Sequence, residues 1–163
     1  MKYEFVELVG VRVVGLMTRT SVGNVGVTDD VPKLWRDFYR TRVEQCLSDI
    51  DSERYRYATV SYGYDRRTEQ FNVIVGCFKK PFGRETSGFQ KCVVPAGTYA
   101  KVEVDGVDPG SISRAWGEIY SDARILKACD FKIKMKAYRQ AGDGVDIFIS
   151  APNYSRQEGD CRT

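Results

Sequence analysis

The stretch ISRAWGEIY, residues 112–120, places apolar residues three and four positions apart, which is the spacing of one face of an α-helix. An earlier stretch, VPKLWRDFY at residues 31–39, matches it at an offset of 81 positions. The match pairs Trp35 with Trp116 and Tyr39 with Tyr120. A tryptophan and a tyrosine repeated at equal spacing indicate an internal duplication of the chain.

Both stretches lie in segments that begin with helix-start signals. The first segment, Asp29 to Leu47, opens with two aspartates followed by Pro32, and the second, Asp108 to Lys127, opens with Asp108 and a proline. The sequence therefore predicts two amphipathic helices at equivalent positions of the two halves.

Runs of alternating or β-branched residues flank each helix, two before it and two after it. In the first half they cover residues 2–8, 11–18, 55–64 and 71–78, and in the second half 89–94, 98–104, 131–138 and 145–149. This order predicts an α+β fold of duplicated ββαββ halves, with an antiparallel sheet, one long helix per half and a pseudo-two-fold cleft. With the helices on one face, we expect the other face of the sheet to be free for a ligand or partner.

The length of 163 residues is typical of one domain. We expect a single domain over residues 1–152, with halves at about 1–80 and 88–152 joined by the polar segment 79–87. Residues 153–163 are expected to form a mobile tail.

Composition excludes several classes of function. The chain has no histidine, so Ser-His and Cys-His triads and His-ligated haem are excluded, and we expect neither a cofactor nor a metal. The five cysteines form no C-x-x-C pair and are expected to be free thiols. Interspersed charges with a net value of +3 argue against direct nucleic-acid binding. No signal peptide or long apolar run is present, so a cytoplasmic location away from membranes is expected.

Three segments of the second half carry a family resemblance. VPAGTYAKVEVDG (94–106), SISRAWGEIY (111–120) and VDIFISAP (145–152) resemble the GyrI-like, or AraC-type effector-binding, pattern of a V-P-A-G-x-Y-A hairpin, an A-W-x-x-I-Y helix and a last strand V-E-I-Y-I-P. VELVGVRVVGLMTRT (6–20) and YATVSYGYD (57–65) fit more loosely. The resemblance covers about residues 1 to 152, so we expect no fused helix-turn-helix module.

The resemblance implies binding of amphipathic, cationic, drug-like small molecules between the two halves, for sequestration or for sensing. Stand-alone relatives also include a protein that protects DNA gyrase and members that hydrolyse cyclopropanoid compounds. A protein-interaction role, with gyrase or a separate DNA-binding regulator, and a hydrolase role for small strained-ring compounds therefore remain alternatives. A hydrolase would have to use Asp146, Tyr138 or a lysine in the cleft, because histidine is absent.

Asp146 is the first candidate for contact with the ligand. It stands where the family pattern has a glutamate that faces the ligand, and it shares one face of the last strand with Phe148. If Val145, Ile147 and Ile149 on the opposite face pack on the helices, Asp146 looks into the cleft. The alternative is a solvent-facing residue held by a neighbouring lysine.

Aromatic residues are expected to supply the walls of the cleft. Tyr138 lies on the strand before Asp146, and Tyr62 flanks the cleft from the first half. Four helix residues at core spacing have rings large enough to reach the cleft: Trp35, Tyr39, Trp116 and Tyr120.

A row of lysines departs from the family pattern. In the strand FKIKMKAY, Lys132, Lys134 and Lys136 share a face with Tyr138, where relatives commonly read F-E-x-Y. The row favours an anionic ligand, or it is a solvated face or a guard against edge pairing. The charge of the ligand therefore stays open, since Asp146 argues for a cation and the lysines against one.

Overall fold

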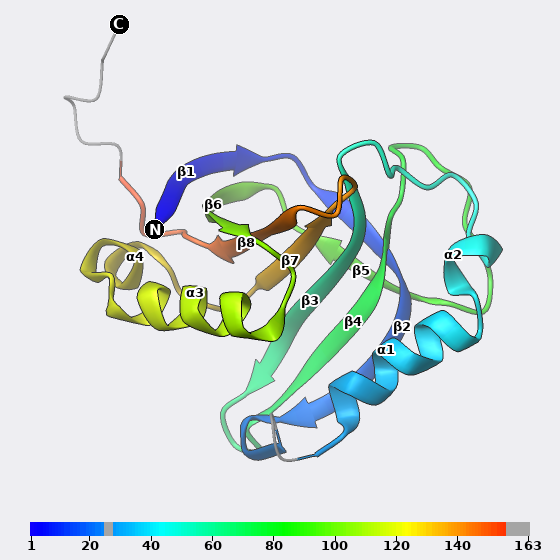
Figure 1. Ribbon diagram of the computed structural model, residues 1–163, viewed down its shortest axis with the longest axis horizontal. Helices are drawn as coiled ribbons and strands as arrows, with labels where there is room; N and C mark the ends of the chain where they lie inside the picture. Colours follow the sequence, from blue (N-terminus) through cyan, green and yellow to red (C-terminus); the bar gives the residue numbers. More distant parts are fainter. Residues whose placement is uncertain (25–27, 156–163) are drawn as a thin grey trace, which may run out of the picture.

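A computed structural model describes residues 1–24 and 28–155 of the protein. Within these residues, eight strands form one antiparallel sheet in the order β1-β6-β8-β7-β3-β4-β2-β5, and helices lie on one side of it (Figure 1). The elements are β1 (Lys2–Leu8), β2 (Val11–Ser21), α1 (Asp30–Arg40), α2 (Val43–Cys46), β3 (Tyr55–Asp65), β4 (Gln70–Phe78), β5 (Gln90–Val94), β6 (Gly97–Asp105), α3 (Pro109–Ser121), α4 (Ala123–Ala128), β7 (Lys134–Arg139) and β8 (Gly144–Ser150).

The strand order shows the duplication directly. The strands β1 to β4 of the first half correspond to β5 to β8 of the second half. When each strand is replaced by its counterpart, the sheet order reads the same from the opposite edge, so the pseudo-two-fold axis passes between β3 and β7. The helices agree, because the rings of Trp35 and Tyr39 stack at 5.6 Å and 25° while those of Trp116 and Tyr120 stack at 5.8 Å and 28°. The predicted α+β class and the internal repeat are confirmed.

The two halves exchange their first strands. β1 pairs with β6 of the second half, from Lys2 opposite Glu103 to Leu8 opposite Gly97. β5 pairs in the same way with β2 of the first half. Together with the pairing of β3 and β7, these contacts join both halves in one hydrogen-bonded sheet.

Each predicted long helix is broken near its end. The first stops at Arg40, because Arg42 has a left-handed backbone with φ of 51° and starts the short α2. The second stops at Ser121, because the Asp122 carboxylate accepts hydrogen bonds from the backbone nitrogens of Arg124 and Ile125 and so caps a new helix, α4. Both breaks lie where a residue favours a cap over helix continuation.

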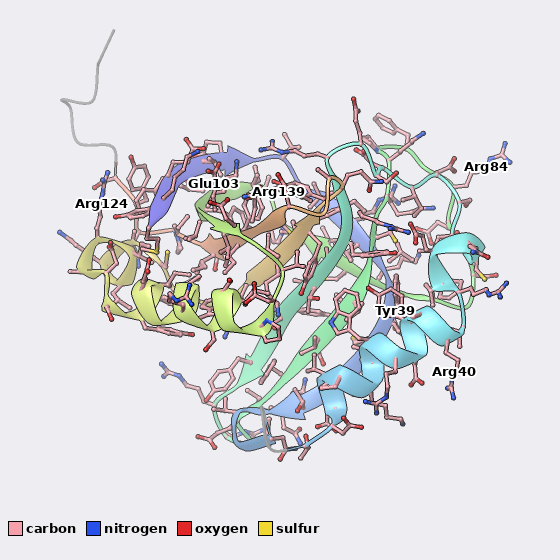
Figure 2. The ribbon with its side chains drawn as sticks, in the orientation of Figure 1. Tyr39, Arg40, Arg84, Glu103, Arg124 and Arg139 are labelled. Carbon is pink, nitrogen blue, oxygen red and sulfur yellow. The ribbon has the colours of Figure 1, made fainter. Side chains whose placement is uncertain are left out.

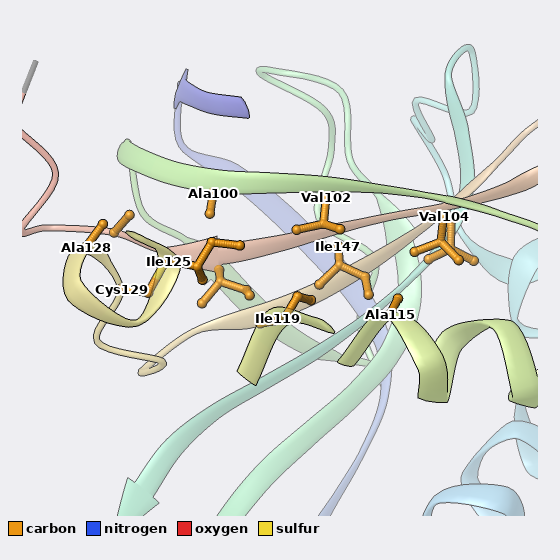
Figure 3. Packing of buried hydrophobic residues seen from close by; sticks show 12 residues of the cluster. Ala100, Val102, Val104, Ala115, Ile119, Ile125, Ala128, Cys129 and Ile147 are labelled. Carbon is orange, nitrogen blue, oxygen red and sulfur yellow. The ribbon is translucent and has the colours of Figure 1, made fainter. Parts of the chain in front are cut away.

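The helices cover the two lateral parts of the sheet. In the second half, Val102 and Ile147 of the sheet pack against Ile119 and Ile125 of the helices, and all four are fully buried (Figure 3). In the first half, Leu34, Phe38 and Val43 pack on alternate residues of β4, namely Val73, Val75 and Cys77. As the periodicity predicts, each helix buries one apolar stripe against one half of the sheet.

The opposite face of the sheet is not free, and that expectation was wrong. Val13, Val60 and Ile74 point away from the helices and are fully buried, and they share a cluster with residues of β5, β6 and β8. The twist of the sheet brings its ends together behind the centre, so this face forms its own core. An open surface for a ligand has to be sought on the helix side.

Gly15 of β2 and Gly76 of β4 pair opposite each other at a close approach of the two strands. A Cβ atom at Gly76 would lie 2.2 Å from the carbonyl oxygen of Val14, and one at Gly15 would lie 2.0 Å from that of Val75. Side chains other than hydrogen therefore do not fit at either position.

The start of the expected mobile tail is packed in the structure. The ring of Tyr154 stacks on Phe5 at 4.1 Å and 13°, and the backbone nitrogen of Asn153 donates to the carbonyl of Ala128. The rest of that tail, residues 156–163, lies outside the described residues. None of the helices in the described ranges is long and apolar enough to cross a membrane.

Candidate functional site

The two central strands present a row of polar and aromatic side chains on the helix side of the sheet. Alternate residues of β3 and β7, such as Val60 and Met135, point into the opposite core, so the residues between them face the helices. Figure 1 shows β3 and β7 running between α1 and α3. We call this row the central strip; in register it pairs Tyr57 with Tyr138, Thr59 with Lys136 and Ser61 with Lys134.

One end of the central strip opens into a pocket of about 610 Å³, here called the lysine pocket. Its volume is in the usual range for sites that bind small molecules. Two phenylalanines, Phe71 and Phe131, provide apolar wall, and three cations face one carboxylate, that of Asp130. The full lining is Val22, Ser61, Tyr62, Gly63, Tyr64, Arg66, Phe71, Asp130, Phe131, Lys132 and Lys134.

The other end opens into a pocket of about 360 Å³, here called the tyrosine pocket. Trp35 of α1 meets the rings of Tyr57 and Tyr138 edge to face, at 6.1 Å and 5.5 Å. The full lining is Trp35, Tyr39, Arg56, Tyr57, Val107, Tyr138, Arg139, Gln140 and Gly142, which contains two arginines and no carboxylate. Figure 2 shows Tyr39 on α1 and Arg139 at the end of β7, on opposite sides of β3.

Lys134 and Lys136 have no charged partner among the described residues, because none of the ion pairs there involves them. Burial lowers the pKa of both amino groups from the ordinary lysine value. The two buried lysines of the described residues do have partners: Lys79 donates to two backbone carbonyls, and Lys101 lies near Glu4 and Glu103, whereas Lys134 and Lys136 are half-buried. The lysines of the central strip are therefore electrostatically unsatisfied.

Thr59 adds a second unsatisfied group. Its side chain is 4% exposed, and its hydroxyl oxygen has no hydrogen-bond partner in the described part of the chain. Buried hydroxyl groups rarely lack a partner in folded proteins. Because Thr59 pairs with Lys136 across β3 and β7, a buried hydroxyl lies beside a half-buried ammonium that has no ion-pair partner in the described ranges.

Asp146 does not face open space. The residue is 2% exposed, and its carboxylate accepts hydrogen bonds from the Tyr55 hydroxyl at 2.5 Å and from Arg139 Nη2 at 2.7 Å. Burial and this carboxylate raise the pKa of Tyr55 well above its ordinary value. Val145, Ile147 and Ile149 pack on the helices as expected, and Asp146, on the other face of β8, points into the opposite core.

The other expected site residues are divided among different parts of the protein. Phe148 lines a separate pocket of about 330 Å³ behind the sheet, together with Tyr55 and Phe78. Tyr62 lines the lysine pocket, and its hydroxyl lies 3.1 Å from the sulfur of Met17. Trp35 and Tyr138 meet in the tyrosine pocket.

Trp116 and Tyr120 line neither the lysine pocket nor the tyrosine pocket. Their rings continue a stack, since Tyr120 lies on Phe131 at 5.4 Å and 20°, and Phe131 reaches the lysine pocket. The equivalent tryptophans of the repeat therefore differ in surroundings at the site.

Sequence reasoning missed Tyr57, Thr59 and Phe131 as site residues. The alternation of β3 would have placed Tyr57 and Thr59 on one face, but only the pairing of β3 with β7 shows that this face adjoins the lysines. Four of the five expected free thiols are confirmed, namely Cys46, Cys77, Cys92 and Cys129, while Cys161 lies outside the described residues.

Comparison with known proteins yields a family match over nearly the whole chain. The family model Cass2, described as integron-associated effector binding protein, matches residues 4–149. No match was found among curated protein sequences.

Two solved structures share the fold. An integron cassette protein from the mobile metagenome of Vibrio cholerae superposes with a TM-score of 0.71 at 19% identity, covering 91% of this chain and 95% of that one. The protein SAV2435, solved with bound tetraphenylphosphonium, superposes with a TM-score of 0.74 at 10% identity, covering 93% and 94%. At these identities the likeness shows a common fold.

Proposed function

Because the chain belongs to the Cass2 family of integron-associated effector binding proteins, a GyrI-like family, we propose that it binds an amphipathic small molecule along the central strip. The observation that carries this proposal is that two pockets, of about 610 and 360 Å³, lie at the two ends of one strand pair on the helix side of the sheet. The bound tetraphenylphosphonium of SAV2435 supports a bulky aromatic ligand for this fold. The binding serves to sequester or to sense that ligand.

The walls favour a ligand with a flat aromatic body. Trp35, Tyr57 and Tyr138 present ring edges and faces at one end of the strip, and Phe71 and Phe131 do so at the other. Aromatic pairs contribute about 0.5–1.5 kcal/mol each beyond the area that they bury. The floor is part of a continuous sheet, so the ligand meets a preformed surface.

Asp146 is not part of the proposed site. The sequence-based expectation of a cationic ligand rests on the family resemblance and on a carboxylate that faces the ligand at this position, and in the structure this carboxylate holds Arg139 and Tyr55. In the proposal, Asp146 stabilises the fold by holding Arg139 and Tyr55, and it contacts no ligand.

The internal repeat provides a matched test of the site. Four aromatic probes, biphenyl-4-carboxylate, biphenyl-4-carboxamide, biphenyl-4-yltrimethylammonium and tetraphenylphosphonium, are titrated by calorimetry into the wild type, Trp35→Leu and Trp116→Leu. Both variants lose a half-buried tryptophan from a helix, but only Trp35 lines the tyrosine pocket. We expect at least one probe to bind and Trp35→Leu to weaken it about tenfold, which equals about 1.4 kcal/mol.

The control variant Trp116→Leu should bind the same probe within about threefold of the wild type, a difference of about 0.7 kcal/mol. Absence of binding for all four probes, or equal losses in both variants, would contradict the proposed site.

A further inference from the structure

The central strip holds charge that nothing in the described protein neutralises. Lys136 and Lys134 project from β7 toward the helix side, and the groups that flank Lys136 there are Thr59, Ile147, Lys134 and Tyr138. Each of these neighbours is neutral or positively charged at pH 7. A half-buried ammonium without a counter-charge can gain from an anionic partner that arrives from outside.

The lysine pocket has an excess of positive charge, whereas the two arginines of the tyrosine pocket are paired, Arg56 with Glu44 and Arg139 with Asp146. Arg66, Lys132 and Lys134 line the lysine pocket against the single carboxylate of Asp130. That carboxylate is already engaged, because it accepts hydrogen bonds from the Ser150 hydroxyl and the backbone nitrogen of Lys132. Cations that surround a hollow attract anions into it and repel other cations.

Lys136 and Thr59 are neighbouring donors on the central strip, between the residues that line the two pockets. The two residues are direct partners across β3 and β7, where Cβ atoms lie about 4.5–5.5 Å apart. An ammonium and a hydroxyl can both donate to the oxygens of one carboxylate. The same oxygens would satisfy the Thr59 hydroxyl, which is buried near Lys136 and Tyr138 and has no hydrogen-bond partner within 3.5 Å in the described part of the chain.

We propose that the ligand of this protein is an organic anion, an aromatic or apolar body that carries a carboxylate, and that Lys136 and Thr59 bind the carboxylate at the centre of the strip. Lys134 adds positive charge on the side of the lysine pocket, where the body of the ligand lies against Phe131 and Phe71. This inference rests on the proposed function, since it names the chemical class of the molecule that fills the same site.

The test compares three biphenyl probes that differ only in their head group: biphenyl-4-carboxylate, biphenyl-4-carboxamide and biphenyl-4-yltrimethylammonium. Each is titrated by calorimetry at pH 7 and low salt into the wild-type protein. We expect the carboxylate to bind at least tenfold more tightly than the carboxamide, and the ammonium compound to bind most weakly. Raising the salt concentration should reduce the advantage of the carboxylate.

Two variants assign the preference to the residues. Lys136→Met removes the charge at nearly constant length and is expected to bring the carboxylate to within twofold of the carboxamide. Thr59→Val removes only the hydroxyl and is expected to weaken the carboxylate threefold to tenfold. Lys127→Met, which removes an equal charge from the exposed side of α4, should leave all three affinities unchanged. Circular dichroism of each variant verifies that it is folded.

The outcomes separate this inference from the proposed function. If the carboxamide and the ammonium compound bind through Trp35 and the carboxylate has no advantage, the ligand site stands and the anion preference is refuted. A carboxylate advantage that persists in Lys136→Met would likewise overturn the assignment to Lys136. If none of the three biphenyl probes binds but tetraphenylphosphonium binds through Trp35, the ligand site stands and the anion preference is refuted; if none of the four probes binds, both proposals fail.

Discussion

Replacing Asp146 by asparagine should destabilise the protein by about 3 kcal/mol and leave ligand affinity unchanged. The carboxylate is almost fully buried and accepts hydrogen bonds from Tyr55 and, through two nitrogens, from Arg139. Asparagine keeps the shape but leaves the guanidinium without its closest counter-charge. Breaking a buried pair costs about 3–5 kcal/mol, and the lower end applies because Arg139 is 20% exposed and lies 3.8 Å from two further carboxylates.

Urea and thermal unfolding followed by circular dichroism measure this loss. For a chain of this size, 3 kcal/mol corresponds to a fall in Tm of about 6–12 °C. Asp105→Asn is the control, because Asp105 lies 3.8 Å from the same guanidinium but is fully exposed, so little change is expected. A variant Asp146→Asn with wild-type stability and a weakened affinity for the biphenyl probes would refute this reasoning and return Asp146 to the ligand site.

Three further predictions concern the site, the sheet and the thiols. Lys136→Met should stabilise the ligand-free protein by about 1 kcal/mol at pH 7, as measured by urea unfolding. This gain should shrink as the pH rises through the lowered pKa of Lys136 toward 10.5, because the folded wild type then loses the unpaired charge. An equal gain at all pH values would contradict this prediction. Gly76→Ala should lower the free energy of unfolding in urea by about 3 kcal/mol, because its Cβ would overlap the Val14 carbonyl. The control Gly117→Ala, at an exposed helix position with open space, should raise it by about 0.5–1 kcal/mol. Equal effects would exclude the overlap as the cause. Cys46 should react fastest among the described cysteines in a mass-spectrometric time course with iodoacetamide at pH 8, because it is exposed. Burial raises the pKa of the other three thiols, to about 12 for Cys77 and about 11 for Cys92 and Cys129. Comparable rates for these buried thiols would be inconsistent with that reasoning.

The arrangement of elements could be predicted from the sequence because it depends on local patterns. The repeat of Trp35 and Tyr39 as Trp116 and Tyr120, with flanking alternation, indicates ββαββ twice, and all eight strands are found, although β7 begins at Lys134 and not at residue 131, so Lys132 lies outside the strand. The helix break at Asp122 was missed, because the apolar spacing of the helix face continues through it to Ile125. The Asp122 carboxylate caps the backbone of α4, and this local hydrogen bonding ends α3 although the apolar spacing continues.

The site was harder to predict because it depends on how the two halves meet. Alternation correctly separates Asp146 from Ile147, but it does not reveal which face of the sheet stays open. That depends on the twist of the whole sheet, which closes the face of Asp146 and leaves that of Lys136 between the helices. Among the sequence features, the lysine row that departs from the family pattern indicated the proposed site most directly.

The exchange of first strands has a consequence for how the chain folds. β1 finds its partner about one hundred residues later along the chain, since Lys2 pairs with Glu103. Pairings of such long range slow folding, and the first half emerging from the ribosome has no second half against which to place β1. A polypeptide ending after β4 would have a vacant place beside β2 and an unplaced β1. Two such polypeptides can fill each other's vacancy by swapping these strands, so the expected product of the half gene is a domain-swapped homodimer with the outline of the full-length protein.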